Sequence, residues 1–212
     1  MFCAHCGAIQ PPDAAATRFQ VLGVSPAFDV DLAALERRYK ELTRQLHPDK
    51  FARADARARR ASLQRTVQLN QAWKTLRDPG RRAEYLLSLA GIDVGTEEGT
   101  QRRTADGSKQ KLPVPHELLI DVMELREGLM EARMAEDEAR VAELAAEVRG
   151  RKQAAMQAVG AALRAQPADV DAAARELVAV RYFDRFLNEV DVHDDARADA
   201  EARSPSESTG HG

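Results

Sequence analysis

The tripeptide His47-Pro48-Asp49 carries residue types well suited to contacting a partner. Proline fixes its own φ, offers no N–H, and disfavours helical geometry for the residue before it. It therefore holds an imidazole and a carboxylate on a stiff turn, where the carboxylate can accept charge-assisted hydrogen bonds from a cation. An exposed turn has no cavity that excludes water, so this pattern favours binding over acid–base catalysis. The alternative is a solvated turn with no role.

Two amphipathic helices are predicted to hold this turn, one over residues 31–46 and one over residues 54–77. Both segments have apolar residues at helical spacing. Helices joined by a short polar loop pack as an antiparallel hairpin, which places the tripeptide at its tip. The apolar positions are Leu32, Leu35, Tyr39, Leu42 and Leu46 before the turn, and Leu63, Val67, Leu69, Ala72, Trp73 and Leu76 after it.

Short helices are predicted on both sides of the hairpin. Thr17 can cap a helix that ends at Gly23, and Pro79 can begin a helix that continues to about Ala90 before Gly91 ends it. No Gly-rich phosphate loop and no nucleophile with a placed base is recognisable in the chain. We therefore expect a protein that is not an enzyme.

An HPD tripeptide between two antiparallel helices resembles the signature of J-domains, the co-chaperone modules that stimulate DnaK-type ATPases. The flanking residues resemble one family more closely, HscB, the J-protein of iron–sulfur cluster assembly. The resemblance covers roughly residues 18–190. It is carried by Phe19-Gln20-Val21-Leu22-Gly23-Val24, Phe51, Asn70-Gln71-Ala72-Trp73, Arg82-Ala83-Glu84-Tyr85-Leu86-Leu87, Leu118-Leu119-Ile120-Asp121-Val122-Met123-Glu124-Leu125-Arg126-Glu127 and Val180-Arg181-Tyr182-Phe183-Asp184.

The resemblance implies that the HPD tip contacts the ATPase domain of an HscA- or DnaK-type chaperone. Arg37, Lys40 and Arg44 recur three and four residues apart and share a helix face, which can steer an acidic partner. A solvated face is the alternative. Nucleic acid is not expected, because the net charge is −3 and no aromatic stacking platform is present. The implied ATPase-binding residues are Arg37, Arg38, Lys40, Arg44, His47, Pro48, Asp49 and Lys50.

The predicted helix from residue 115 to about 134 carries two apolar stripes. Leu118, Val122, Leu125 and Leu129 suit a bundle core, while a second stripe lies beside them, at Leu119, Ile120, Met123, Met130 and Met134. One helix of a three-helix bundle cannot easily bury both stripes. The second stripe therefore predicts a binding surface, a larger bundle or a homodimer seam. The resemblance implies binding of the scaffold protein IscU by Leu119, Ile120, Met123, Glu124, Glu127 and Tyr182.

Cys3 and Cys6 form a single CxxC pair. Two thiolates at this spacing supply half of a tetrahedral zinc site, but no second pair follows. We keep three interpretations: an unmetallated remnant, a zinc or iron site completed by dimerisation, and a redox-active dithiol. We therefore assign no metal and no cofactor to the chain, with Cys3 and Cys6 as the candidate ligands.

Composition fits a globular chain of one or two domains, with 212 residues, 44% of them hydrophobic and 31% charged. No apolar run is long enough to cross a membrane, no secretory signal is recognisable, and two cysteines suit a reducing cytoplasm. Residues 18–90 hold fifteen Lys and Arg against eight Asp and Glu, whereas residues 116–148 hold ten acidic residues against three arginines. This asymmetry suggests two domains with different partners.

The sequence therefore predicts an all-α protein with an N-terminal J-domain and a C-terminal three-helix bundle. The segments are a tail (1–16), the J-domain (17–91), a flexible linker (92–114), the bundle (115–190) with Val180, Phe183, Phe186, Leu187 and Val190 in its core, and a disordered tail (191–212). We expect a monomeric cytoplasmic co-chaperone that delivers IscU to the chaperone and stimulates its ATPase. The alternatives are a general J-protein for unfolded clients, an oligomer joined through the methionine stripe, and a metal sensor built on the CxxC.

Overall fold

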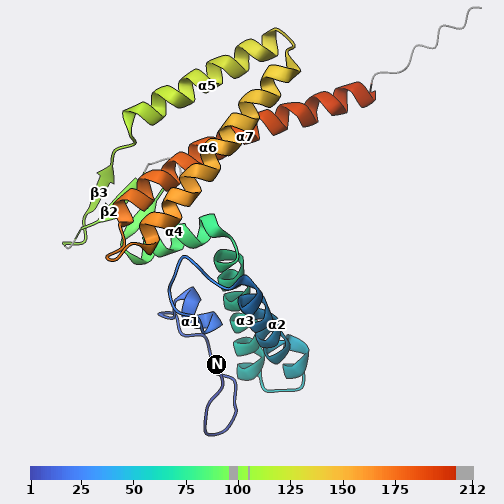
Figure 1. The fold of residues 1–212 in the computed structure, drawn as a ribbon. Coiled ribbons are helices and arrows are strands. Elements are labelled where there is room, and N and C mark those ends of the chain that lie inside the picture. Colours follow the sequence, from blue (N-terminus) through green and yellow to red (C-terminus); the bar gives the residue numbers. More distant parts are fainter. Residues whose placement is uncertain (96–99, 105, 204–212) are drawn as a thin grey trace, which may run out of the picture. The chain divides into compact units, whose positions relative to one another are not determined.

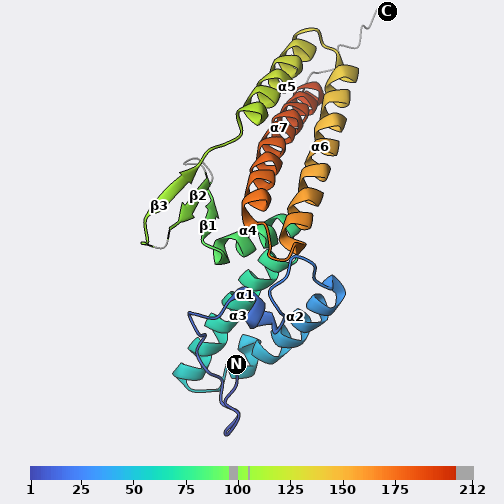
Figure 2. The same cartoon turned by 60° about the vertical axis from the view of Figure 1, so that its left-hand side comes forward.

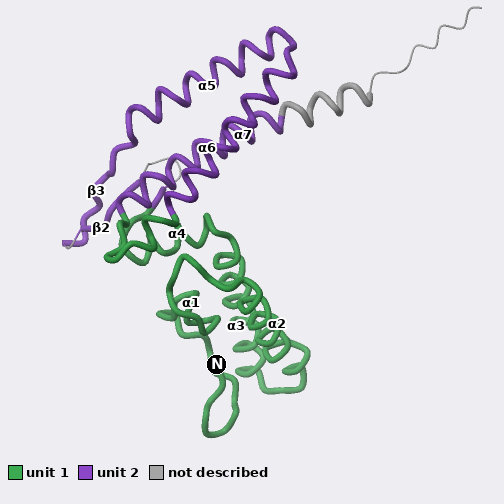
Figure 3. The backbone as a smooth tube through the Cα atoms, in the orientation of Figure 1, with its two compact units in different colours: residues 1–93, 160–170 green, residues 94–159, 171–212 purple. Residues whose placement is uncertain are grey.

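The computed structural model describes residues 1–95, 100–104 and 106–203, with side chains up to residue 192, and most of its elements are helices (Figure 1). The chain divides into two compact units, residues 1–93 with 160–170 and residues 94–159 with 171–212 (Figure 3). The predicted all-α fold is confirmed for the J-domain and the C-terminal bundle, and one small sheet is present that was not predicted.

The first unit contains four helices and a one-turn 3₁₀ helix. They are α1 (Arg18–Leu22), α2 (Leu32–Leu46), η1 (Pro48–Phe51), α3 (Ala56–Leu76) and α4 (Pro79–Leu89). Each α-helix begins at a side-chain cap: Thr17 forms a capping box with Gln20, and an aspartate caps each of the other three helices. Gly23 ends α1 with φ of 70°, a left-handed conformation that glycine adopts without steric cost.

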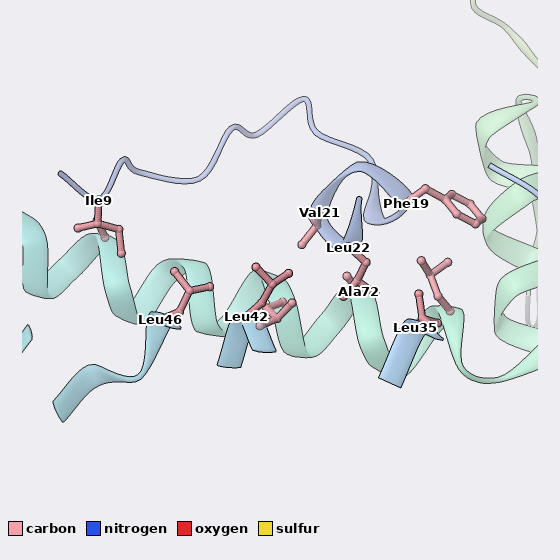
Figure 4. Close-up of a cluster of buried hydrophobic side chains, with 11 residues drawn as sticks. Ile9, Phe19, Val21, Leu22, Leu35, Leu42, Leu46 and Ala72 are labelled. Atoms are coloured by element: carbon pink, nitrogen blue, oxygen red, sulfur yellow. The ribbon is translucent and has the colours of Figure 1, made fainter. Parts of the chain in front are cut away.

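The core of this unit lies where α1 and α2 pack against α3. Figure 4 shows Leu35, Leu42 and Leu46 of α2 spaced along α3, with Leu22 of α1 beside them. On α3 the buried positions include Leu69, Ala72 and Leu76, as predicted. Leu63 and Val67 are more than half exposed, so their predicted place in the apolar face is wrong. The reason is that α3 turns Ala61, Ser62 and Arg65 inward, which leaves residues 63 and 67 on the opposite side.

Three long helices form the second bundle: α5 (His116–Met134), α6 (Glu138–Arg164) and α7 (Val170–Arg203). Figure 2 shows α5, α6 and α7 side by side. The predicted core of α7 is confirmed, because Val180, Phe183, Phe186, Leu187 and Val190 are all buried.

The predicted end of the last helix near residue 190 is wrong, because α7 continues to Arg203. Residues 191–203 therefore belong to a helix and not to the expected disordered tail. Their composition explains the error: the segment is polar and lacks an apolar face, but it is rich in alanine, aspartate and arginine and contains neither glycine nor proline. The rest of the expected tail, residues 204–212, lies outside the described residues.

The expected flexible linker contains three short strands, β1 (Ile92–Val94), β2 (Thr100–Arg103) and β3 (Lys109–Leu112), in the order β1-β2-β3. Strands β2 and β3 pair antiparallel, with Arg103 opposite Lys109. Polar composition concealed β2 and β3, which backbone hydrogen bonds and not an apolar face define, whereas β1 buries Ile92 and Val94. One usable signal was present in Asp106-Gly107, a pair that favours tight hairpin turns, and Gly107 has φ of 84°.

The N-terminal segment, expected to be an irregular tail, is anchored to the first unit. Phe2 and Ile9 form an antiparallel bridge, and Ile9 is buried in the core. Arg65 donates hydrogen bonds from Nε to the Gln10 carbonyl at 3.0 Å and from Nη2 to the Pro11 carbonyl at 2.7 Å. Burial lowers the pKa of the Arg65 guanidinium, a cost that these bonds help to offset.

Candidate partner-binding surfaces

The α2–α3 tip, residues 47–51, displays the imidazole and the carboxylate that the sequence singles out. Helix α2 ends at Leu46, and His47 turns the chain out of the helix with φ −55° and ψ 128°. Its Nδ1 accepts a hydrogen bond from the Asp49 N–H at 3.3 Å, and its carbonyl accepts one from the Lys50 N–H at 3.0 Å. The side chains of His47 and Asp49 are 53% and 90% exposed. The predicted exposure of the tip is confirmed, and its contact with an ATPase stays a prediction.

Ser62 fixes the base of this tip from the neighbouring helix. Its buried hydroxyl donates to the Leu46 carbonyl at 2.7 Å, and Thr66 Oγ1 lies 3.4 Å from the same oxygen. Leu46 is fully buried, so this carbonyl at the end of α2 is satisfied by α3 and not by water. Sequence reasoning missed Ser62. The available signal was a serine inside an apolar helix face, where a hydroxyl needs a partner.

The basic face of α2 is exposed, as expected, but its charges are not equally available. Arg38 pairs with Glu41 at 2.8 Å, and Lys40 pairs with Glu36 at 2.7 Å. The hydrogen bond from Lys40 lowers the pKa of the Glu36 carboxyl. Over the described part of the chain, the structure gives no ion pair to Arg37, Arg44 or Lys50, which are all exposed. Their positive charge is therefore the part of this surface that is best able to attract an acidic partner.

The first turns of α3 add positive charge that sequence reasoning did not assign. Arg57, Arg59 and Arg60 are exposed close behind the tip in the chain, and Arg59 donates to the Ala54 carbonyl at 3.1 Å. The run Arg57-Ala58-Arg59-Arg60 was the sequence signal for this additional positive charge. The basic surface thus extends from α2 across the tip to the start of α3.

An apolar surface lies on α5, in the second unit. Val122, Leu125 and Leu129 are buried as predicted, while the second stripe is left in solvent. Ile120 is 42% and Met123 is 70% exposed, Leu119 is half-buried, and Glu124 and Glu127 are exposed. Exposed apolar side chains grouped on one helix indicate an interaction surface. The alternative of a larger bundle fails within the described chain, because neither α6 nor α7 covers this stripe.

Tyr182 of α7 lies at the level of this surface. The bundle runs up, down and up, so α5 and α7 point the same way, and an ion pair joins Arg126 to Glu189. Leu119 and Tyr182 each lie seven residues, about two turns, before that pair, which places them at the same height. The Tyr182 ring is half-buried, with the Arg185 guanidinium 5.8 Å from its centre. The structure thus places Leu119 and Tyr182, which are 63 positions apart in the chain, at the same height along the bundle.

Cys3 and Cys6 lie in a tight N-terminal turn. The Gly7 N–H donates to the Cys3 carbonyl and the Cys3 N–H to the Ala8 carbonyl, both at 2.9 Å, with Gly7 at φ 70°. Backbone N–H groups of Cys6 and His5 lower the pKa of the Cys3 thiol, which favours its thiolate. Within the described residues, no group of three or more His, Cys, Asp or Glu side chains is placed to hold a metal ion. The three interpretations of the CxxC pair stay open.

Comparisons with known proteins match both parts of the chain to known domain families. Residues 17–85 match the DnaJ domain family, and residues 114–191 match the HSCB C-terminal oligomerisation domain family. Two HscB homologues from Shewanella sp., strains ANA-3 and MR-4, are each 46% identical over 111 residues. That stretch is 52% of this chain and 57% of each relative, so the match spans little more than half the length of these curated proteins.

Solved structures extend the likeness over most of the chain. The human co-chaperone HscB superposes with a TM-score of 0.74 at 30% identity, covering 91% of this chain and 89% of the human one. The HscB chaperone from Vibrio cholerae gives 0.67 at 28% identity, covering 85% and 99%. The fold and the HPD tip therefore define a J-domain co-chaperone. Within that class, the chain belongs to the HscB family.

No helix in the described part of the chain is both long and apolar enough to cross a membrane.

Proposed function

We propose that this chain is an adaptor that binds an IscU-type iron–sulfur scaffold protein, delivers it to an HscA- or DnaK-type chaperone and stimulates the ATPase of that chaperone. The observation that carries the proposal is the presence of two chemically different exposed surfaces on two separate units. One is a basic surface with a polar tip, and the other is an apolar helix face with flanking carboxylates. Such surfaces suit two different partners and not one.

The chaperone would dock on the first unit. Arg37, Arg44 and Lys50 steer an acidic face of the ATPase, while Asp49 accepts hydrogen bonds from a cation of that partner. Pro48 and the hydrogen bond from Ser62 to Leu46 keep the tip in one conformation, so little ordering entropy is lost on docking. Hydrolysis occurs in the partner. The adaptor supplies no reacting group and needs no cofactor of its own.

The scaffold would dock on α5. Leu119, Ile120 and Met123 bury apolar area against it, Glu124 and Glu127 pair with basic residues, and Tyr182 closes the surface from α7. Holding scaffold and ATPase on one chain raises their concentration relative to each other, so a weak encounter becomes efficient. The two cysteines are unpaired, which fits the reducing cytoplasm that we propose as the compartment.

The test joins both surfaces in one assay. With purified chaperone, IscU-type scaffold and this chain, we expect ATP turnover to rise most when all three are present. Leu119→Ala with Met123→Ala should weaken scaffold binding by about 2–4 kcal/mol in calorimetry, the range of interface hot spots. Leu63→Ala with Val67→Ala, an exposed apolar pair on α3, is the matched control. Scaffold affinity equal in both double variants would remove α5 from the proposed site.

A general J-protein for unfolded clients is a second candidate, favoured by the exposed methionines of α5, whose flexible side chains adapt to many apolar sequences. It predicts that reduced, denatured proteins compete with the scaffold for α5. The adaptor function predicts that a large excess of denatured protein leaves scaffold affinity unchanged.

A further inference from the structure

The apolar surface of α5 continues beyond the residues assigned to scaffold binding. Outward positions Ile120, Met123, Glu127, Met130 and Met134 follow each other at spacings of three, four, three and four. This is the spacing by which one helix presents a continuous seam to another helix. Met130 and Met134 are 57% and 81% exposed, among the most exposed large apolar residues of the described chain. The inward seam of Val122, Leu125, Leu129 and Ala132, by contrast, is buried within the bundle.

A groove of about 340 Å³ lies at the end of this seam. It is lined by Arg126, Leu129, Met130, Arg133, Met134 and Glu189.

The walls of the groove are tied together. Arg126 forms an ion pair with the Glu189 carboxylate, and Arg133 Nη2 donates to the Glu189 carbonyl at 2.7 Å. Because these contacts join α5 to α7, the groove exists before any partner arrives. A preformed apolar groove with a few polar groups on its rim is the usual form of a binding pocket.

The charges along the seam define what fits it. The Glu127 carboxylate lies in the middle of the seam, and Glu124 lies beside it. Two guanidiniums, those of Arg126 and Arg133, line the groove together with the carboxylate of Glu189. A complementary segment therefore carries a Lys or Arg facing Glu127. It also carries a bulky apolar side chain for the groove, within about 10 Å along the helix axis.

A second copy of this chain fits the seam poorly. Glu127 is its central position, so a parallel pair of copies in register, or an antiparallel pair centred on the seam, would bury Glu127 against Glu127 of the other copy. Two carboxylates removed from water without a cation between them oppose association. A different protein with a cation at this place meets no such obstacle.

We infer that the scaffold-binding surface of α5 includes the methionine groove, and that Met130 and Met134 receive an apolar side chain of the scaffold next to a cation that pairs with Glu127. The inference rests on the proposed function. It adds a second contact region one to two helix turns beyond Glu127 and fixes the direction in which a scaffold segment lies along α5.

Calorimetry with purified IscU-type scaffold tests the groove. Met130→Ala with Met134→Ala should raise Kd roughly tenfold or more, as truncation of two central apolar contacts does. Leu63→Ala with Val67→Ala, similarly exposed on α3, should leave Kd unchanged. Urea unfolding checks that both double variants keep the stability of the original chain. A Kd for the methionine variant equal to that of the control overturns the inference and leaves the proposed function intact.

Two further outcomes are decisive. If the original chain binds no scaffold at all, the proposed function fails, and the inference fails with it. If sedimentation shows a dimer that Met130→Ala with Met134→Ala dissociates, a second copy occupies the groove and the inference is wrong.

Methionine oxidation gives a readout without any substitution. Hydrogen peroxide converts the thioether to a sulfoxide and is itself reduced to water. In the complex, Met130 and Met134 should oxidise several-fold more slowly than in the free chain, while Met1 should oxidise at the same rate in both. Equal rates at Met130 and Met134 with and without scaffold would contradict the inference.

Discussion

The α2–α3 tip and the β2–β3 turn each expose an aspartate, but they use it differently. In the β2–β3 turn, the Asp106 carboxylate accepts hydrogen bonds from the Thr104 hydroxyl and from the Ser108 N–H, the latter at 3.0 Å. In the α2–α3 tip, the Asp49 carboxylate has no Lys or Arg partner among the described residues, and the His47 Nδ1 that lies 3.5 Å from it already accepts the Asp49 N–H. The first carboxylate holds its own turn together, whereas the second is left for another molecule.

The difference shows how the tip keeps its shape without its acid. Pro48 limits the backbone, the His47 ring accepts the Asp49 N–H, and Ser62 holds the Leu46 carbonyl from below. None of these contacts requires the Asp49 carboxylate. A partner-binding tip requires a turn that keeps its shape without the group that contacts the partner, here the Asp49 carboxylate.

The largest expected effect follows from exchanging these two acids for amides. Asp49→Asn should reduce stimulation of chaperone ATP turnover tenfold or more, because a charge-assisted hydrogen bond to the partner becomes a neutral one. Asp106→Asn should leave stimulation unchanged. Both are measured by steady-state ATP hydrolysis with chaperone and scaffold present. Equal stimulation by the two variants would contradict the different roles assigned to Asp49 and Asp106.

A second prediction concerns the support below the tip. Ser62→Ala leaves the buried Leu46 carbonyl with only the longer contact to Thr66, and should lower the free energy of unfolding by about 1–3 kcal/mol. The measurement is urea denaturation followed by circular dichroism. Ser25→Ala, at an exposed serine between α1 and α2, is the control and should change stability by less than about 0.5 kcal/mol. An unchanged free energy of unfolding for Ser62→Ala would mean that the Ser62 hydrogen bond does not support the tip.

A smaller effect is expected from the cations beside the tip. Arg37→Ala and Arg44→Ala should each slow association with the chaperone several-fold at low salt, and the loss should disappear as salt screens the charges. Arg38→Ala should have less effect, because Glu41 already offsets the Arg38 charge at 2.8 Å. Stopped-flow association at two ionic strengths separates these cases. An Arg38 variant as slow as the Arg37 variant would show that the intrahelical pair opens on docking.

The smallest change is in the titration of Asp106. Its hydrogen bonds lower the pKa to about 2, mainly through the Thr104 hydroxyl. Because the pKa of Asp106 is lower in the folded turn than in the unfolded chain, its carboxylate stabilises the folded turn at pH values above the ordinary aspartate pKa. This stabilisation is lost as the pH falls through about 2. Carbon-detected NMR should show this midpoint, and Thr104→Ala should move it upward. A midpoint unaffected by Thr104→Ala would mean that the threonine bond does not hold the turn.

The sequence predicted the helices accurately where several local signals agreed. Thr17, Asp31 and Pro79 mark the starts of α1, α2 and α4, and the apolar spacing placed Leu35, Leu42 and Leu46 in the core. Prediction failed where backbone pairing or distant contacts decide the structure. The strands β2 and β3 carry no apolar alternation, and the N-terminal segment is ordered by Arg65, more than fifty residues away.

The sequence by itself determined where most helices begin, which tripeptide interrupts the hairpin and that α5 carries two apolar stripes, because helix periodicity and caps are local properties. Only the tertiary structure decided that no other described helix covers the second stripe of α5, and that Tyr182 lies level with Leu119. It also decided that Arg126, Arg133 and Glu189 enclose a groove, and that Ser62 supports the tip. Each of these facts depends on contacts between helices. Such contacts are set by packing over the whole unit, which a single segment does not encode.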